Sequence, residues 1–174
     1  MLEFVALLRG VNVGGVKVPM ADLRDTAAGC GLDDVRSYIA SGNLVFRASG
    51  SVAEVRARLE AAIARRFGRD IPVWTATGPE FRAIVAACPY RVDDGRRVHA
   101  LFPLGSAAVD PEAWSRWAKP SEALARAGGI FWLHTPEGFG QSAVGAKLDR
   151  IVTGDGVTGR NLNTTAALVE MLDG

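Results

Sequence analysis

The chain has 174 residues, of which 48% are hydrophobic and 22% charged, a composition typical of a folded protein and not of a disordered one. This length suffices for one ordinary domain or for two very small ones. The formal net charge of +1 gives no support to a dedicated nucleic-acid binder, which carries a clear basic excess. We therefore expect no nucleic-acid partner.

The first predicted element is a central strand over Leu2–Leu8, an apolar run interrupted only by Glu3. No cleavage-site pattern follows it, and no apolar run reaches the roughly 20 residues that cross a bilayer. We therefore expect a cytoplasmic protein without a membrane partner. A glycine-rich loop over Arg9–Lys17 comes next, and Pro19 suits the first turn of a helix. That helix carries an apolar face of Met20, Leu23 and Ala27.

Two strands, a helix and another strand follow. Ser41-Gly42-Asn43 is a hairpin signal between strands predicted over Val35–Ala40 and Leu44–Arg47. A capping box at 51–54 begins a helix, and Ile71–Thr75 predicts the next strand. The order strand, helix, strand, strand, helix, strand is the split β-α-β unit of a ferredoxin-like fold.

The pairing expected for this unit runs the first strand parallel to the third. Under that expectation the loop after the first strand and the turn between the second and third strands lie at opposite edges of the sheet. Arg9 and Asn43 should then be far apart.

The second half repeats a similar element order. A turn-rich segment from Cys88 to Arg97 is the best boundary, so we predict an α+β protein of two sub-domains. These are a ferredoxin-like half over residues 1–88, a connection over 89–96 and a similar mixed unit over 97–174. The elements expected in the second half are strands over Val98–Leu104, Glu122–Arg126, Ile130–His134 and Val157–Arg160, a helix beginning at Asp110-Pro111-Glu112, and helices over Gln141–Val152 and Asn163–Leu172.

The cysteines and histidines predict no metal site. Cys30 and Cys88 each end an apolar helical stretch, which is typical of small buried hydrophobes. His99 and His134 are the only histidines and lack the clustered spacing of a zinc site. We expect no disulfide, no metal and no cofactor.

The loop over Arg9–Lys17 is the strongest candidate site, because a loop between a buried strand and a helix can turn backbone N–H groups toward an anion. Phosphate-loop spacing fails, since Val16 stands where lysine is required after Gly15, and the dinucleotide fingerprint is absent. The alternative is that the glycines only shape a sharp connection. The ligand-binding residues predicted here are Arg9, Asn12, Gly14, Gly15 and Lys17.

Two further polar segments are candidates. Arg160, Asn161 and Asn163 lie at the start of the last predicted helix, where they would bind an anion or only cap the helix. Ser41 and Asn43 form a second candidate site or a plain hairpin turn. We expect the Arg9–Lys17 loop to line a concave surface faced by at least one residue of the 160–163 segment.

Three blocks of the sequence resemble those of a known family. The blocks are Phe4–Gly15 with Lys17–Met20 and Leu23-Arg24, then Val35-Arg36, Tyr38-Ile39 and Ser41–Phe46, and finally Thr158–Thr164. Together they resemble the domain of unknown function 1697 family, an uncharacterised bacterial family. The resemblance implies a two-part α+β fold with a ferredoxin-like first half, and it implies no activity. The family's last block often carries Trp where this chain has Leu162, so the chain lacks an aromatic ring there.

Three functions remain open from the sequence. The first is a binding module for a small anionic ligand, such as a nucleotide or a phosphorylated metabolite. The second is an enzyme acting on such a ligand, oriented by Asn12, Asn43 or Asn161, although no general base is evident. The third is a protein-interaction module that uses a sheet face.

Overall fold

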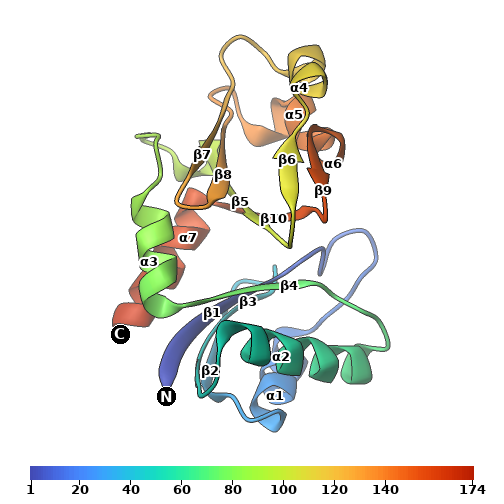
Figure 1. The fold of residues 1–174 in the computed structure, drawn as a ribbon, viewed down its shortest axis with the longest axis vertical. Coiled ribbons are helices and arrows are strands. Elements are labelled where there is room, and N and C mark those ends of the chain that lie inside the picture. The colour runs from blue at the N-terminus through green and yellow to red at the C-terminus, as the bar shows by residue number, and fades with distance from the viewer. The chain divides into compact units, whose positions relative to one another are not determined.

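The computed structural model describes all residues, 1–174, and the chain divides into two compact units (Figure 1). The first unit comprises residues 1–82 and 167–174, and the second comprises 83–166. The divisions fall within α3 (Gly78–Ala86) and α7 (Leu162–Asp173). The predicted connection over 89–96 lies inside the second unit.

The first unit contains a four-stranded antiparallel sheet in the order β2-β3-β1-β4. Its element order is the predicted one: strand, helix, strand, strand, helix, strand. The elements are β1 (Leu2–Leu8), α1 (Met20–Gly29), β2 (Asp33–Tyr38), β3 (Asn43–Ala48), α2 (Val52–Phe67) and β4 (Val73–Thr77).

The expected direction of the third strand is wrong. β1 runs antiparallel to β3, with Leu7 opposite Asn43. A crossover through α1 makes β1 and β2 run in the same direction, and the tight turn after β2 reverses the chain into β3. The loop after β1 and the β2–β3 turn therefore lie at the same end of the sheet. The Leu8 N–H donates a 2.9 Å hydrogen bond to the Gly42 carbonyl.

Two helices, α1 and α2, cover one face of this sheet (Figure 1). Val55, Leu59 and Ile63 recur at helical spacing along α2 and pack against the alternate side chains of β1 and β3. The predicted capping box is present, since the Ser51 hydroxyl accepts from the Glu54 N–H and the Glu54 carboxylate accepts from the Ser51 N–H. β1 is buried on both faces from Phe4 to Leu8, as its unbroken apolar run predicts.

The second unit contains a sheet with an equivalent order, β10-β5-β8-β7, and a two-stranded sheet of β6 and β9. The strands β5, β7, β8 and β10 correspond to β1, β2, β3 and β4 of the first unit. With this correspondence, the two sheets have the same strand order, read from opposite edges. The predicted similarity of element order thus extends to strand pairing. The elements are η1 (Gly95–Arg97), β5 (Val98–Pro103), β6 (Ala107–Val109), α4 (Pro111–Trp117), β7 (Ala123–Ala127), β8 (Ile130–His134), η2 (Phe139–Gln141), α5 (Ala143–Ala146), α6 (Leu148–Ile151), β9 (Val152–Gly154) and β10 (Val157–Asn161).

The helix predicted over Gln141–Val152 is wrong. The segment forms two short helices, α5 and α6, which meet at Lys147, and the chain then enters β9. Pairing of β9 with β6 supplies backbone hydrogen bonds that the sequence pattern does not reveal. The strand β6 was not predicted.

The core of the second unit lies between its large sheet and the short helices α4, α5 and α6. Leu101, Phe131 and Leu133 point from the sheet into this core, and Trp114 and Trp117 pack against it from α4. Asp110 caps α4 by accepting from the Glu112 and Ala113 N–H groups. No helix in either unit is both long and apolar enough to cross a bilayer.

The close approach between Gly42 and β1 gives a stability prediction. A Cβ at Gly42 would lie 2.7 Å from Val11 Cγ2 and 2.8 Å from Leu8 Cβ, and its φ is +81°. We expect Gly42→Ala to lower the free energy of unfolding in urea by about 3 kcal/mol or more, because steric overlap adds to backbone strain. Gly14→Ala is the matched control, since φ is +58° there and a Cβ would touch nothing within 4 Å. Gly14→Ala should lower the free energy of unfolding by about 1 kcal/mol. Equal losses in the two variants would show that the contacts of a Cβ at position 42 with Val11 and Leu8 add nothing to the backbone strain.

Candidate functional site

The Arg9–Lys17 loop lines a hollow of about 430 Å³ in the first unit, here called the loop hollow. Gly14, Gly15 and Lys17 belong to its wall, whereas Arg9 is exposed and does not. Lys17 is the only charged side chain in the wall. The lining residues are Asn12, Val13, Gly14, Gly15, Val16, Lys17, Val18, Pro19, Met20 and Ala40.

Asn12 stabilises the backbone around this hollow. Its Oδ1 accepts a 2.9 Å hydrogen bond from the Val18 N–H, and its Nδ2 donates to the carbonyls of Val18 and Ala40. Its φ of +58° lies in the left-handed region, which asparagine tolerates better than most residues. Both polar atoms of the amide thus bind the chain itself. The side chain fastens the entry of α1 to the β2–β3 turn.

The second candidate, Ser41 and Asn43, belongs to that same turn. Asn43 is fully buried, and its Nδ2 donates to the Tyr38 carbonyl at 3.0 Å and to the Ser41 hydroxyl at 2.8 Å. These bonds fix the turn that the sequence predicts. The structure therefore brings the first and second candidate segments together, contrary to the separation expected for Arg9 and Asn43.

The C-terminal candidates lie on opposite faces of the second unit's sheet. Arg160 and Asn161 are consecutive in β10, and successive side chains of a strand point to opposite faces. Arg160 is buried, and its Nη1 donates to the Thr158 hydroxyl and the Gly159 carbonyl, each at 2.8 Å. Burial lowers its pKa to about 10, so it remains a cation at neutral pH.

Asn161 caps α7, because its Oδ1 accepts a 3.0 Å hydrogen bond from the Thr164 N–H. The adjacent Asn163 lies directly against Gly95 of η1, where a Cβ would collide with its Oδ1. The 160–163 segment is thereby joined to the chain that enters β5. Whether this segment faces the Arg9–Lys17 loop stays a prediction.

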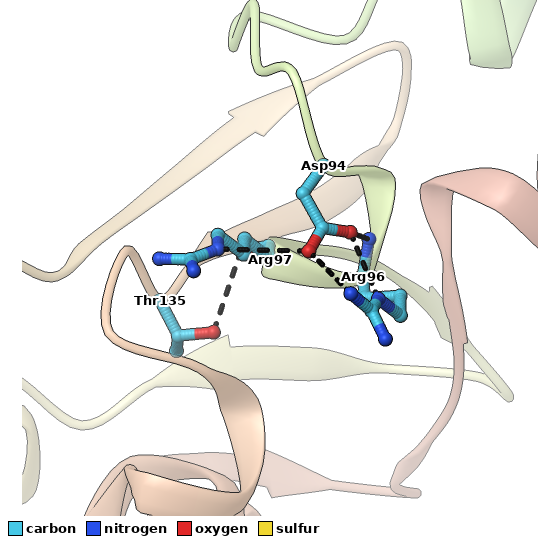
Figure 2. Close-up of polar contacts among 4 residues, drawn as sticks. All are labelled: Asp94, Arg96, Arg97 and Thr135. Carbon is cyan, nitrogen blue, oxygen red and sulfur yellow. Dashed lines mark hydrogen bonds and ion pairs between the residues drawn. The ribbon is translucent and has the colours of Figure 1, made fainter.

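A second hollow, of about 400 Å³, lies around Asn161 and is here called the polar hollow. Three charged side chains from the segment before β5 line it. Figure 2 shows Asp94 between the two arginines, Arg96 and Arg97. The lining residues are Asp94, Arg96, Arg97, His99, Gly138, Phe139, Gly140 and Asn161.

Asp94 organises the arginines of the polar hollow. Its Oδ1 accepts from the Arg96 Nε at 3.0 Å and its Oδ2 from the Arg96 Nη2 at 2.9 Å, whereas the Arg97 Nε lies 3.7 Å away (Figure 2). The bonds from Arg96 lower the pKa of the Asp94 carboxyl to about 2. The Thr135 N–H holds the Arg97 backbone by a 2.8 Å bond to its carbonyl. Two cations and one anion leave the group with one net positive charge.

His99 adds a neutral imidazole to this hollow. Its ring stacks on Phe139 with centroids 4.0 Å apart, and its Nδ1 is buried without a protein partner. Burial lowers the pKa of His99 to about 4. At neutral pH the ring is therefore uncharged and offers one N–H donor and one lone pair.

Of the residues that line the polar hollow, the sequence pattern indicated Asn161 but not Asp94, Arg96, Arg97 or His99. These four residues lie in or beside the turn-rich segment that was interpreted as a boundary. The pairing of His99 with Asn161, across β5 and β10, and the contact of Asn163 with Gly95 bring the two stretches together. The charged residues directly before the strand that begins at Val98 were the sequence feature that could have indicated this site.

The cysteines are free, partly buried thiols. Cys30 packs against the core of the first unit, and Cys88 lies in the second unit. Burial raises the pKa of each thiol. No three His, Cys, Asp or Glu side chains are grouped in a way that could hold a metal ion.

The bonds of Asn12 predict a structural and not a ligand-binding role. Asn12→Ala should lower the free energy of unfolding by about 3 kcal/mol, since three hydrogen bonds at about 1 kcal/mol each are lost. Lys17→Ala, in the same loop, should change it by less than about 0.5 kcal/mol. Urea unfolding of both variants, without added ligand, makes the comparison. If Asn12→Ala is as stable as the native chain, the Asn12 side chain is not needed for the fold and is again a candidate ligand contact.

The burial of His99 predicts a loss of stability in mild acid. Its pKa is lower in the folded state, about 4, than the usual 6.5, so the unfolded chain binds the proton more tightly. The contribution is complete above about pH 6.5 and is lost as the pH falls toward 4, by about 3 kcal/mol in all. Urea unfolding at pH 7 and pH 4 should show a smaller drop for His99→Asn than for the native chain. Equal drops would show that His99 is not protected from protonation.

Comparison with known proteins gives a family and a fold but no activity. The chain is similar to a solved structure described as the conserved bacterial protein SP0830 from Streptococcus pneumoniae, with 29% identity and a TM-score of 0.78. The match covers 100% of this chain and 99% of that one. No curated protein matches the chain. The model of the family described as "Protein of unknown function (DUF1697)" matches residues 1–131, and the chain therefore belongs to that family.

Proposed function

We propose that the protein binds a small anionic ligand of the phosphate or nucleotide kind, and that the polar hollow is its site. The observation that carries the proposal is the pairing of Arg96 and Arg97 beside Asp94 at the edge of a hollow of about 400 Å³. Guanidinium groups form strong, charge-assisted hydrogen bonds with phosphate and carboxylate oxygens.

The two arginines have different roles in this proposal. Arg96 makes two hydrogen bonds to Asp94, so much of its charge is already balanced. Arg97 approaches the same carboxylate only at 3.7 Å, and its side chain is about half exposed. Arg97 is therefore the cation that gains most from an incoming anion.

The remaining lining residues supply donors without adding charge. The Asn161 Oδ1 is used by the helix cap, and its Nδ2 donates to no protein acceptor. Gly138 and Gly140 flank Phe139 and leave the backbone uncovered by side chains. A neutral His99 completes a site suited to an anion that also carries hydrogen-bonding groups.

The loop hollow supports the same function less well. Lys17 is its only cation, and the amide of Asn12 is occupied by backbone groups. Arg9 remains a candidate contact outside the wall of that hollow, and the test below includes it.

An enzyme acting on such a ligand is the second candidate, and His99 is the observation that favours it. A histidine in an anion site is the usual general acid or base. A pKa of about 4 makes its imidazole a weak base at neutral pH, however, and its Nδ1 has no hydrogen-bond partner that would orient the ring. Binding is therefore the better supported function.

The test is a thermal-shift and calorimetric titration with inorganic phosphate, pyrophosphate and AMP at low ionic strength. An anion that binds only the folded state raises the melting temperature. Arg97→Ala should weaken binding about tenfold, which corresponds to about 1.4 kcal/mol, and Arg96→Ala should weaken it less. Added salt should weaken binding of all three anions.

Arg116→Ala is the matched control, because Arg116 is exposed and ion-paired with Glu112 elsewhere in the same unit. It should leave binding unchanged. Loss of binding in Arg9→Ala with normal binding in Arg97→Ala would move the site to the loop after β1. The absence of any anion-dependent shift would refute the proposed function.

A further inference from the structure

A third hollow, of about 250 Å³, lies in the second unit and has a mostly apolar lining, and it is here called the apolar hollow. None of its residues lines the polar hollow, and the proposed function does not use it. The lining residues are Val109, Pro111, Trp114, Leu124, Ala125, Arg126 and Phe131.

The residues that line this hollow come from four elements, β6, α4, β7 and β8. Asp110 and Pro111 fix the start of α4, and Trp114 follows three residues later on the same helix face. Leu124 and Arg126 alternate along β7, so they share one face of that strand. β7 is the edge strand of its sheet and pairs only with β8.

Arg126 is the one charged residue of the apolar hollow. It lies directly opposite Phe131 in the β7–β8 pair, and its guanidinium carbon is 5.2 Å from the centre of the Phe131 ring. The side chain is exposed and forms no ion pair with any carboxylate of the protein. Packing on the ring holds the exposed guanidinium beside the apolar wall, where its N–H groups can donate to an incoming anion.

We propose that the apolar hollow binds a small organic carboxylate with an aromatic or branched aliphatic body. The body lies against Trp114, Leu124 and Phe131, and the carboxylate pairs with Arg126. A cavity of about 150 Å³ lined by such side chains is enough to hold a benzene ring. The volume of about 250 Å³ therefore accepts one ring or a branched alkyl group, but not a nucleotide.

The charge and the surface of the hollow select this class of ligand. An uncharged apolar molecule leaves Arg126 without a partner, and a phosphate dianion loses more hydration than a single guanidinium restores in an apolar wall. A carboxylate carries one charge and matches the planar guanidinium with two parallel hydrogen bonds.

The test compares three probes by calorimetry and by two-dimensional amide NMR of the whole chain. Phenylacetate has both the ring and the carboxylate, benzyl alcohol has the ring alone, and acetate has the carboxylate alone. We expect phenylacetate to bind at least tenfold more tightly than either and to shift the amide signals of Ala125 and Arg126. No binding of phenylacetate, or equal binding of benzyl alcohol, would overturn the proposal.

Arg126→Gln should weaken phenylacetate binding about tenfold, and Arg116→Gln is its matched control. The Arg116 guanidinium also packs on an aromatic ring, with its central carbon 5.5 Å from the centre of the Trp117 ring. Arg116 does not line the hollow. Leu124→Trp, which narrows the hollow and keeps the charge, should also weaken binding. Unchanged binding in Arg126→Gln, or concentration-dependent shifts of the same signals without ligand, would overturn the proposal, the latter because a second copy of the chain would then cover the hollow.

Discussion

Pairing of the central strand β5 with both β8 and β10 is the constraint on which the polar hollow depends. The register with β10 sets His99 opposite Asn161, and the register with β8 sets it opposite Leu133. Since paired residues share a face, His99 and Asn161 meet on the side of the sheet that carries the helices. The same alternation sends Arg160 to the other face. A shift of β10 by one residue would exchange Arg160 and Asn161, and the hollow would lose its amide.

The polar and apolar hollows show how one small unit separates two kinds of surface. The arginines beside Asp94 come from a 3₁₀ turn before β5, where the chain is exposed and the charges stay hydrated. Trp114, Leu124 and Phe131 belong to elements that pack in the core of the second unit. Exposing these side chains as fully as the arginines would lose the free energy gained by burying apolar surface. Arg126 combines the two kinds of surface, because its side chain is exposed to solvent and also packs on the ring of Phe131. The two hollows therefore differ in the ligands that their surfaces favour.

In the first unit, hydrogen bonding within the chain accounts for most of the polar residues that the sequence singles out. Asn12 and Asn43 are each engaged by backbone carbonyls, and Gly42 gives the room that β1 needs beside the turn. A loop rich in glycine and asparagine is typical of both an anion site and a tightly bonded turn. Bond partners distinguish the two, and they assign Asn12 to the scaffold of the loop hollow.

The sequence by itself determined the elements whose signals are local. The apolar run of β1, the capping box of α2, the Asp-Pro start of α4 and the glycine turn between β7 and β8 each follow from neighbouring residues. The order of elements in each half follows from these, and so does the similarity between the halves. Only tertiary structure decided the break between α5 and α6, the pairing of β6 with β9 and the approach of Asp94, Arg96 and His99 to Asn161. Each of these depends on contacts between residues far apart in the sequence. Hydrophobic periodicity predicts the type of each element but not which strands will pair.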